Sequence, residues 1–233
     1  MILAGMQNLT LLDFPGKTAC TVFTYGCNFR CPFCHNASLV TDAKPDMPLD
    51  VETVYSYLRK RQGLLDGVCI TGGEPLLQRD LEDFIRSIRA LGYAVKLDTN
   101  GSMPERLIAM CESGLIDMVA MDIKNSPALY ASTAGTEQVS VEAVNESVRY
   151  LVRGKVSYEF RTTVVQEYHD AESFAVIGKW LQGADAYYLQ QFRDSGALIC
   201  SGLHACSPSQ MHQYLEIVQN YIPRAALRGI EMK

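Results

Sequence analysis

Short apolar runs recur along the chain at intervals of about one helix and one strand. Each run is four to ten residues long, rich in Val, Ile, Leu or Tyr, and followed by Gly, Asp, Asn or Pro. Runs of this length, bounded by turn residues, are typical of buried strands. The pattern predicts strands at Ala19–Thr24, Gly67–Thr71, Tyr93–Thr99, Met118–Ile123, Val156–Val165 and Tyr187–Gln191.

Amphipathic stretches lie between these runs. Their apolar residues recur at helical spacing, and glycine follows several of them where a helix would end. Ser207 before Pro208 is a capping residue followed by proline at the first helical position. The pattern predicts helices at Val51–Arg61, Asp80–Leu91, Pro104–Ser113, Val141–Arg153, Ala171–Leu181 and Pro208–Tyr221.

Strands that alternate with helices form a parallel sheet with right-handed crossovers. Six such strands are too few for a complete eightfold barrel. We therefore expect an α/β fold, a partial (β/α)6 TIM-like open barrel, built as a single domain over residues 1–233. An apolar run at Leu9–Leu12 and a turn at Phe14–Lys17 come before the first core strand. The segment Asp42–Asp50 is interpreted as a link.

Composition narrows the class of protein. The chain has 233 residues, 48% hydrophobic and 20% charged, with a net charge of −5. This suits a soluble domain and does not indicate nucleic acid binding. We see no signal peptide and no membrane-spanning stretch, so we expect a cytoplasmic protein without membrane contacts.

Three cysteines, Cys27, Cys31 and Cys34, lie within eight positions directly after the first predicted core strand. Soft sulfur ligands favour iron–sulfur clusters, zinc or copper(I). A [4Fe–4S] cluster normally takes four thiolates. Three would leave one iron open to a substrate, much as a catalytic zinc site keeps one position free.

Other interpretations of this stretch remain. A zinc site could use the three cysteines and His35, although structural zinc sites usually draw on two separated pairs. Cys31 to His35 also matches the c-type haem attachment pattern, which leaves Cys27 unexplained. A disulfide is disfavoured in an intracellular protein.

With Phe33 before the third cysteine, the Cys-x3-Cys-x2-Cys pattern resembles the signature of the radical S-adenosylmethionine enzymes. The resemblance implies that Cys27, Cys31 and Cys34 hold a [4Fe–4S] cluster and that S-adenosylmethionine chelates its fourth iron. Reductive cleavage of that cofactor then releases a 5′-deoxyadenosyl radical. In such enzymes the cofactor carries the hard chemistry and the protein supplies binding and orientation.

Residues just after the later strands are expected to gather at the same end of the sheet. Gly72 and Gly73 permit close backbone approach, and Glu74 can accept a hydrogen bond from an amine, although an ordinary turn is the alternative. One βα unit after the cysteines, this stretch resembles the family's Gly-Gly-Glu-Pro motif, which implies binding of the methionine amino group.

Two aspartates end the next strands. Asp98-Thr99 can be read as a capped turn, and Asp122 after an apolar run needs a partner or a cation. Both resemble the glycyl-radical activating enzymes, such as pyruvate formate-lyase activating enzyme. The resemblance implies that Asp98, Thr99 and Asp122 help hold the cofactor and a monovalent cation, with the carbonyl of Ile123.

The last two predicted strands contribute further candidates. Arg161 inside an apolar strand needs an anionic partner. A carboxylate or ribose of the cofactor would serve, and so would Glu159 or Asp122. The activating enzymes have a polar residue near the adenosine, which here would be Gln190 or Gln191.

The segments Met6–Lys17 and Tyr188–Arg193 look most like the anaerobic ribonucleoside-triphosphate reductase activating proteins. That resemblance implies that the chain generates a glycyl radical on a partner reductase and receives its electron from a flavodoxin- or ferredoxin-type reductant. One alternative is a radical S-adenosylmethionine enzyme acting on a small molecule or peptide. Another is an iron–sulfur electron carrier. Cys200 and Cys206 read as structural or incidental thiols.

Overall fold

The computed structural model describes residues 1–41 and 47–230, and its core is one eight-stranded sheet in the order β1 to β8. β1 is antiparallel to β2, with Gln7 opposite Thr21, and every later strand is parallel to the one before it. The strands are β1 (Leu3–Thr10), β2 (Ala19–Thr24), β3 (Gly67–Gly72), β4 (Ala94–Thr99), β5 (Met118–Asp122), β6 (Ser157–Val164), β7 (Tyr187–Gln191) and β8 (Ala226–Arg228).

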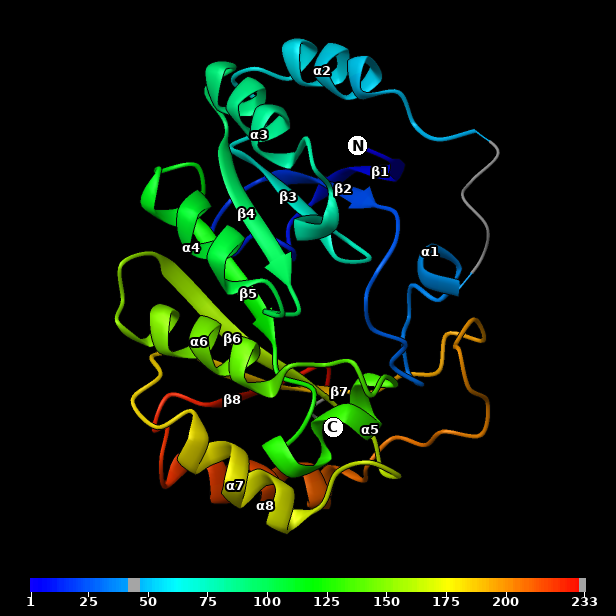
Figure 1. The fold of residues 1–233 in the computed structure, drawn as a ribbon, viewed down its shortest axis with the longest axis vertical. Coiled ribbons are helices and arrows are strands. Elements are labelled where there is room, and N and C mark those ends of the chain that lie inside the picture. The colour runs from blue at the N-terminus through cyan, green and yellow to red at the C-terminus, as the bar shows by residue number, and fades with distance from the viewer. Residues whose placement is uncertain (42–46, 231–233) are drawn as a thin grey trace.

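Helices connect the parallel strands. Figure 1 shows α2, α3, α4, α6 and α7 following one another along one side of the curved sheet, while the segments after β2 and β7 lie on the other side. The helices are α1 (Ser38–Thr41), α2 (Val51–Lys60), α3 (Leu81–Ala90), α4 (Pro104–Glu112), α5 (Tyr130–Ala134), α6 (Val141–Val152), α7 (Ala171–Trp180) and α8 (Pro208–Gln219), with 3-10 turns η1 (Pro75–Leu77) and η2 (Pro127–Leu129).

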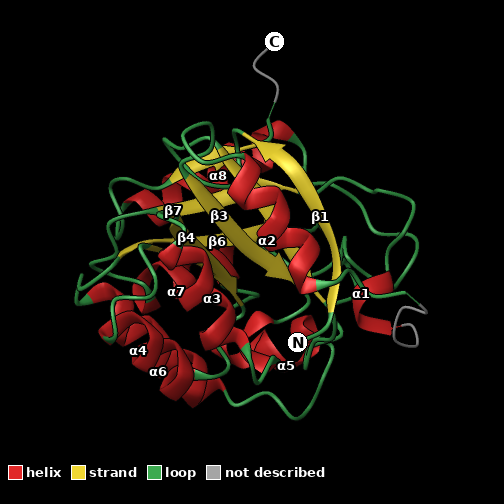
Figure 2. Ribbon diagram, turned by 90° about the horizontal axis from the view of Figure 1, so that it is seen from above, coloured by secondary structure: helices red, strands yellow, loops and turns green. Residues whose placement is uncertain are grey.

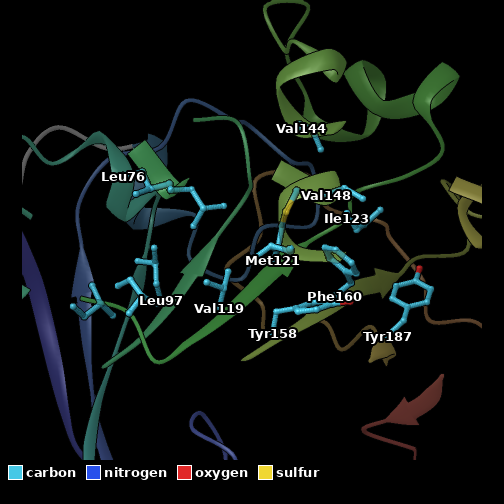
Figure 3. Packing of buried hydrophobic residues seen from close by; sticks show 14 of the residues in the cluster. Leu76, Leu97, Val119, Met121, Ile123, Val144, Val148, Tyr158, Phe160 and Tyr187 are labelled. Atoms are coloured by element: carbon cyan, nitrogen blue, oxygen red, sulfur yellow. The ribbon is translucent and has the colours of Figure 1, made fainter. Parts of the chain in front are cut away.

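Alternate residues of the strands face two different environments. One set is apolar, fully or almost fully buried, and belongs to the hydrophobic cluster shared with the helices. Figure 3 shows part of this cluster, including Leu97, Val119 and Phe160. The other set is largely polar and lines a cavity, because successive side chains of a strand point to opposite faces. The apolar core therefore lies on the helix-covered face of the sheet. The polar side chains that line the cavity lie on the concave face.

The structure confirms the open, partial barrel and adds a strand at each edge. All six predicted strands and six predicted helices are present, with their bounds shifted by at most two residues. The apolar run Leu9–Leu12 overlaps the end of β1 but continues beyond it, and Leu12 is 89% exposed. Figure 2 shows β1 at the edge of the sheet beside α2, where the Tyr57 hydroxyl donates to the Asn8 carbonyl over 2.6 Å.

Two further predictions concern the link at Asp42–Asp50 and membrane-spanning helices. Residues 42–46 of the predicted link lie outside the described residues, and Leu49 forms a bridge with Leu3. Among residues 1–41 and 47–230, none of the helices has both the length and the apolar character that crossing a bilayer requires.

Candidate active site

A cavity of about 430 Å³ lies on the concave face, at the carboxyl ends of the parallel strands. Strands β2 to β7 all contribute to its wall, and the loop after β2 forms one side. The structure brings eleven of the twelve predicted site residues together at this cavity: Cys27, Cys31, Phe33, Cys34, Gly72, Gly73, Asp98, Thr99, Asp122, Arg161 and Gln190.

The cysteine loop is anchored at several points by the rest of the chain. Its backbone is bonded to the segment after β5, to the segment after β7 and to its own end, and the Asn36 side chain reaches the end of β3. The bonds are Arg30 N to Ala134 O (2.8 Å), Cys200 N to Pro32 O (2.9 Å), Gly26 N to Leu39 O (2.9 Å) and Asn36 Nδ2 to Gly72 O (3.1 Å).

All three cysteines of this loop are free thiols. Burial raises the pKa of the Cys27 thiol to about 12 and also raises the pKa of Cys31. Coordination to a metal is what would hold such thiols in the thiolate form. Three soft sulfur donors on one side of a polar cavity fit a [4Fe–4S] cluster, which would keep one iron without a protein ligand.

The His35 ring contacts the segment after β7. Its Nε2 lies 2.7 Å from the carbonyl oxygen of Arg193, and its ring stacks on Phe192 with a centroid separation of 5.7 Å. Within the described part of the chain, no three His, Cys, Asp or Glu side chains are arranged to hold a single metal ion. The histidine instead ties the cysteine loop to the segment after β7.

Gly72 and Gly73 allow the loop after β3 to pack closely against the backbone of Thr24–Gly26. A Cβ atom on Gly73 would lie 1.9 Å from the carbonyl oxygen of Gly26, and one on Gly72, which has φ +119°, would lie 2.3 Å from that of Thr24. The Gly73 amide donates to Thr24 O over 2.9 Å. The close approach expected of these glycines is therefore made to the segment that leads into Cys27, which sets the position of the cysteine loop.

Glu74, the twelfth predicted residue, lies behind the cavity wall and is fully buried. Its carboxylate accepts hydrogen bonds from Leu76 N (3.1 Å), Thr99 Oγ1 (2.8 Å) and Asn100 N (2.7 Å). Burial raises its pKa to about 7, although these three donors favour the charged form. Glu74 thus positions the turn after β4, and its oxygens are already occupied by the protein.

A chain of alternating charges crosses three strands at the cavity. Lys96 pairs with Asp98, and Arg161 Nη1 donates to Asp98 Oδ2 over 3.1 Å. Arg161 Nε also donates to Asp122 Oδ1 over 3.0 Å, and Lys124 Nζ donates to Asp122 Oδ2 over 3.1 Å. Arg161 therefore bridges the two carboxylates, and Glu159 pairs elsewhere, with Arg228.

The charges in this row stabilise one another. Burial alone would raise the pKa of Asp122, but the positive charges of Arg161 and Lys124 outweigh it and hold the pKa at about 2. The negative charges of Asp122 and its neighbours raise the pKa of Lys124 and of Arg161 above their usual values, against the effect of burial. Asp122, Lys124 and Arg161 are therefore charged at neutral pH.

The other predicted contacts are distributed as follows. Phe33 packs against Tyr168, with a centroid separation of 5.9 Å. Gln190 faces the cavity, whereas the Gln191 amide donates to Cys206 O over 2.8 Å on the other face. The Ile123 carbonyl accepts the Thr162 hydroxyl over 2.7 Å, so this oxygen is already engaged.

Sequence reasoning missed several residues of the site. Lys96 is 1% exposed and was hidden in an apolar strand. Asn100 follows the predicted turn residues Asp98 and Thr99 and was not assigned to the site, and Thr21, Phe23 and Thr163 also line the cavity. The signal that could have found most of them is alternation, since polar residues at every second strand position indicate a polar concave face.

The chain is similar to known proteins over most of its length. The Radical SAM superfamily profile matches residues 21–178. A Methanocaldococcus jannaschii protein named "putative glycyl-radical enzyme activating enzyme" is 30% identical over 98% of this chain and 96% of its own length. A 7-carboxy-7-deazaguanine synthase of Methanopyrus kandleri is 28% identical over 76% of this chain and 74% of its own.

Two solved structures share the fold at low sequence identity. A domain of pyruvate-formate lyase-activating enzyme from Bacteroides vulgatus has a TM-score of 0.58 and 17% identity, over 70% of this chain and 99% of that one. Streptococcus suis SuiB bound to S-adenosylmethionine has a TM-score of 0.69 and 15% identity, over 89% of this chain and 49% of that one. Because the superfamily profile spans the cysteine loop and most of the strands, this chain belongs to the radical S-adenosylmethionine (radical SAM) superfamily.

Proposed function

We propose that this chain, acting as one domain, activates a glycyl-radical enzyme, with an anaerobic ribonucleoside-triphosphate reductase-like protein as its partner. The observation that carries this proposal is the end-to-end match to the M. jannaschii protein, which extends beyond the common cysteine motif. The cavity at the carboxyl ends of the strands would admit a loop of such a partner protein.

Membership of the superfamily implies a [4Fe–4S] cluster and S-adenosylmethionine. When bound, they supply one-electron cleavage of the sulfonium and removal of a hydrogen atom from the substrate. Cys27, Cys31 and Cys34 would hold the cluster. We assign cofactor binding to Phe33, Gly72, Gly73, Thr99 and Gln190 on the cavity wall, and to the charged pair Asp98 and Arg161.

The protein's own residues perform the supporting work in this proposal. Arg161 presents a guanidinium between two carboxylates, so its position at the cavity is fixed before a ligand arrives. Such preorganisation lowers the cost of orienting a bound cofactor. Glu74 acts indirectly, by holding Thr99 and the turn after β4, in place of the direct amine contact expected from the motif.

We also propose that the protein's own cations replace the monovalent cation that the resemblance implied beside Asp98, Thr99 and Asp122. Both oxygens of Asp98 are paired with Lys96 or Arg161, and both oxygens of Asp122 with Arg161 or Lys124. Another cation would have to displace one of these partners. Three positive groups already face two negative ones in this row.

A second candidate function is radical chemistry on a small molecule. The match to 7-carboxy-7-deazaguanine synthase covers about three quarters of both chains and favours it. The polar cavity would accommodate a small polar substrate. A flavodoxin- or ferredoxin-type reductant suits either activity.

An anaerobic assay separates these functions. Reconstituted, reduced protein is mixed with S-adenosylmethionine and an anaerobic ribonucleoside-triphosphate reductase. An activating enzyme should form 5′-deoxyadenosine and leave a glycyl radical on the reductase, detected by electron paramagnetic resonance. Release of 5′-deoxyadenosine without a glycyl radical would favour a different substrate, and no release at all would indicate an electron carrier.

A further inference from the structure

Asn100 lies between the Gly-Gly-Glu segment and the first cysteine of the loop. It follows β4 directly, lines the cavity and is 6% exposed. Its backbone amide donates to Glu74 Oε2 over 2.7 Å. Its side-chain amide donates to Asn28 Oδ1 over 2.9 Å and lies 3.8 Å from Cys27 Sγ.

The orientation of the Asn100 side-chain amide is fixed by its partners. Its Oδ1 accepts the backbone N–H of Ser102 over 3.0 Å, which an NH2 group could not do. Asn28 completes the arrangement, since its own Nδ2 donates to Ser102 Oγ over 2.8 Å and its Oδ1 is left to accept from Asn100. The NH2 group of Asn100 is therefore the end that faces the sulfur.

Cys27 Sγ has a second donor on the loop itself, the backbone N–H of Phe29 at 3.3 Å. Hydrogen bonds to a ligand sulfur strengthen when the sulfur carries more negative charge. They therefore stabilise the reduced form of an iron–sulfur cluster more than the oxidised form, which makes its reduction potential less negative.

We propose that Asn100 is a positioning residue that tunes the reduction potential of the cluster through its N–H···S contact with Cys27. The contact also gives the Gly-Gly-Glu segment a physical link to the cluster, through Glu74 and the backbone of Asn100. This inference rests on the radical SAM assignment and is independent of which substrate the enzyme takes.

Two variants test the contact. Asn100→Asp keeps the acceptor for Ser102 N and replaces the donor with an oxygen, and Asn100→Leu removes both functions at similar size. Ser102→Ala is the matched control, because it breaks the Asn28–Ser102 bond in the same turn and leaves the Asn100 NH2 facing Cys27. Each protein is reconstituted anaerobically, assayed for iron and sulfide, and titrated with reductant while its electron paramagnetic resonance signal is followed.

We expect both Asn100 variants to bind the full complement of iron and to be harder to reduce. The shift should be at least tenfold in the reduction equilibrium, which is 59 mV for a one-electron couple. Ser102→Ala should titrate like the wild type. Unchanged potentials in both Asn100 variants, or an equal shift in Ser102→Ala, would overturn the proposal. Failure of both variants to bind iron would assign Asn100 to loop assembly instead and would overturn it too. No partner protein enters the measurement, so its result is separate from that of the glycyl-radical assay.

Discussion

The guanidinium of Arg161 donates to the carboxylate of Asp98 over 3.1 Å, although 63 residues separate the two in the sequence. The pair joins β4 to β6 across β5, and Asp122 on β5 accepts from the same guanidinium. Charged groups taken out of water are costly unless each finds a partner. Here the row is complete, so the concave face can be charged and still be well ordered.

Replacement of Arg161 should therefore destabilise the protein. Arg161→Met leaves Asp98 and Asp122 with one lysine each and removes the group between them. Because Asp122 is about one third exposed, we expect the lower end of the cost of breaking a buried pair, about 3 kcal/mol. Urea unfolding measures it. Arg86→Met, which breaks an exposed pair with Glu82, should cost less than about 1 kcal/mol. Equal losses in the two variants would show that the row carries no special stability.

The charged row also predicts how the protein responds to ions. If Lys96, Arg161 and Lys124 supply all the positive charge beside the carboxylates, S-adenosylmethionine should bind equally well in sodium, potassium or choline chloride at one ionic strength. Equilibrium binding to the reconstituted protein measures this. Lys96→Met, which frees one oxygen of Asp98, should introduce a preference for an alkali cation. Tighter binding of S-adenosylmethionine to the wild-type protein in potassium than in choline would instead support a monovalent cation beside the carboxylates.

Replacing a cysteine of the loop should affect iron binding much more than replacing the neighbouring Cys200. Cys31→Ala should lose most of the bound iron and abolish cleavage of S-adenosylmethionine, because it removes one of the three thiolates proposed to hold the cluster. Cys200→Ala is the control, since Cys200 is exposed and touches the loop through its backbone. Iron analysis and the yield of 5′-deoxyadenosine give the result. Iron loss in Cys200→Ala, with iron retained in Cys31→Ala, would contradict this prediction and indicate that Cys200, not Cys31, is a cluster ligand.

Gly73 offers a steric test of how the cysteine loop is positioned. Gly73→Ala places a methyl group 1.9 Å from the Gly26 carbonyl oxygen, so the backbone before Cys27 must move. We expect a loss of about 3 kcal/mol in unfolding free energy and reduced iron content. Gly5→Ala, where the added atom meets nothing within 4 Å, should change neither quantity. A Gly73→Ala protein with normal stability and iron would mean that the loop adapts freely.

Glu74 makes stability depend on pH. Burial raises its pKa from the ordinary value of 4.5 to about 7 in the folded protein, so the folded state holds the proton more tightly than the unfolded chain. The resulting stabilisation is complete below about pH 4.5 and is lost as the pH rises through 7, a change on the order of 3 kcal/mol. Glu74→Gln lacks this titration. The difference in urea midpoint between wild type and variant should shift against the wild type from pH 5 to pH 8, and a constant difference would mean that Glu74 stays ionised throughout.

Local patterns predicted the elements well because each carries its own signal. Apolar runs, caps and glycine ends located the central strands and helices to within about a turn. β8 was not predicted because it has only three residues, all half-buried, and so shows no apolar run. β1 escaped because its core contact is the antiparallel pairing with β2, and its sequence, LAGMQNLT, lacks a continuous apolar run.

The candidate site was predictable only in part, for a different reason. Position near or just after the end of a strand predicted that Cys27, Asp98 and Asp122 would meet at one end of the sheet, since carboxyl ends of parallel strands meet there. Arg161 lies inside β6 and was recognised only as a charge within an apolar strand. Their pairings depend on which strands are neighbours and on register, which no single segment contains. Glu74 shows the limit, because nothing local tells whether a carboxylate faces a cavity or supports its wall from behind.

Each central strand has a polar side that faces the cavity and an apolar side that faces the helices, and this arrangement constrains how the sequence can evolve. Exchanging one inward side chain would alter the reaction or its ligand and leave the packing with the helices intact. Gaining or losing a single residue within a strand would swap the two sides at once, and would press aspartate and arginine into the helix layer. New chemistry should therefore arise here by substitution inside strands, and insertions should be confined to the loops.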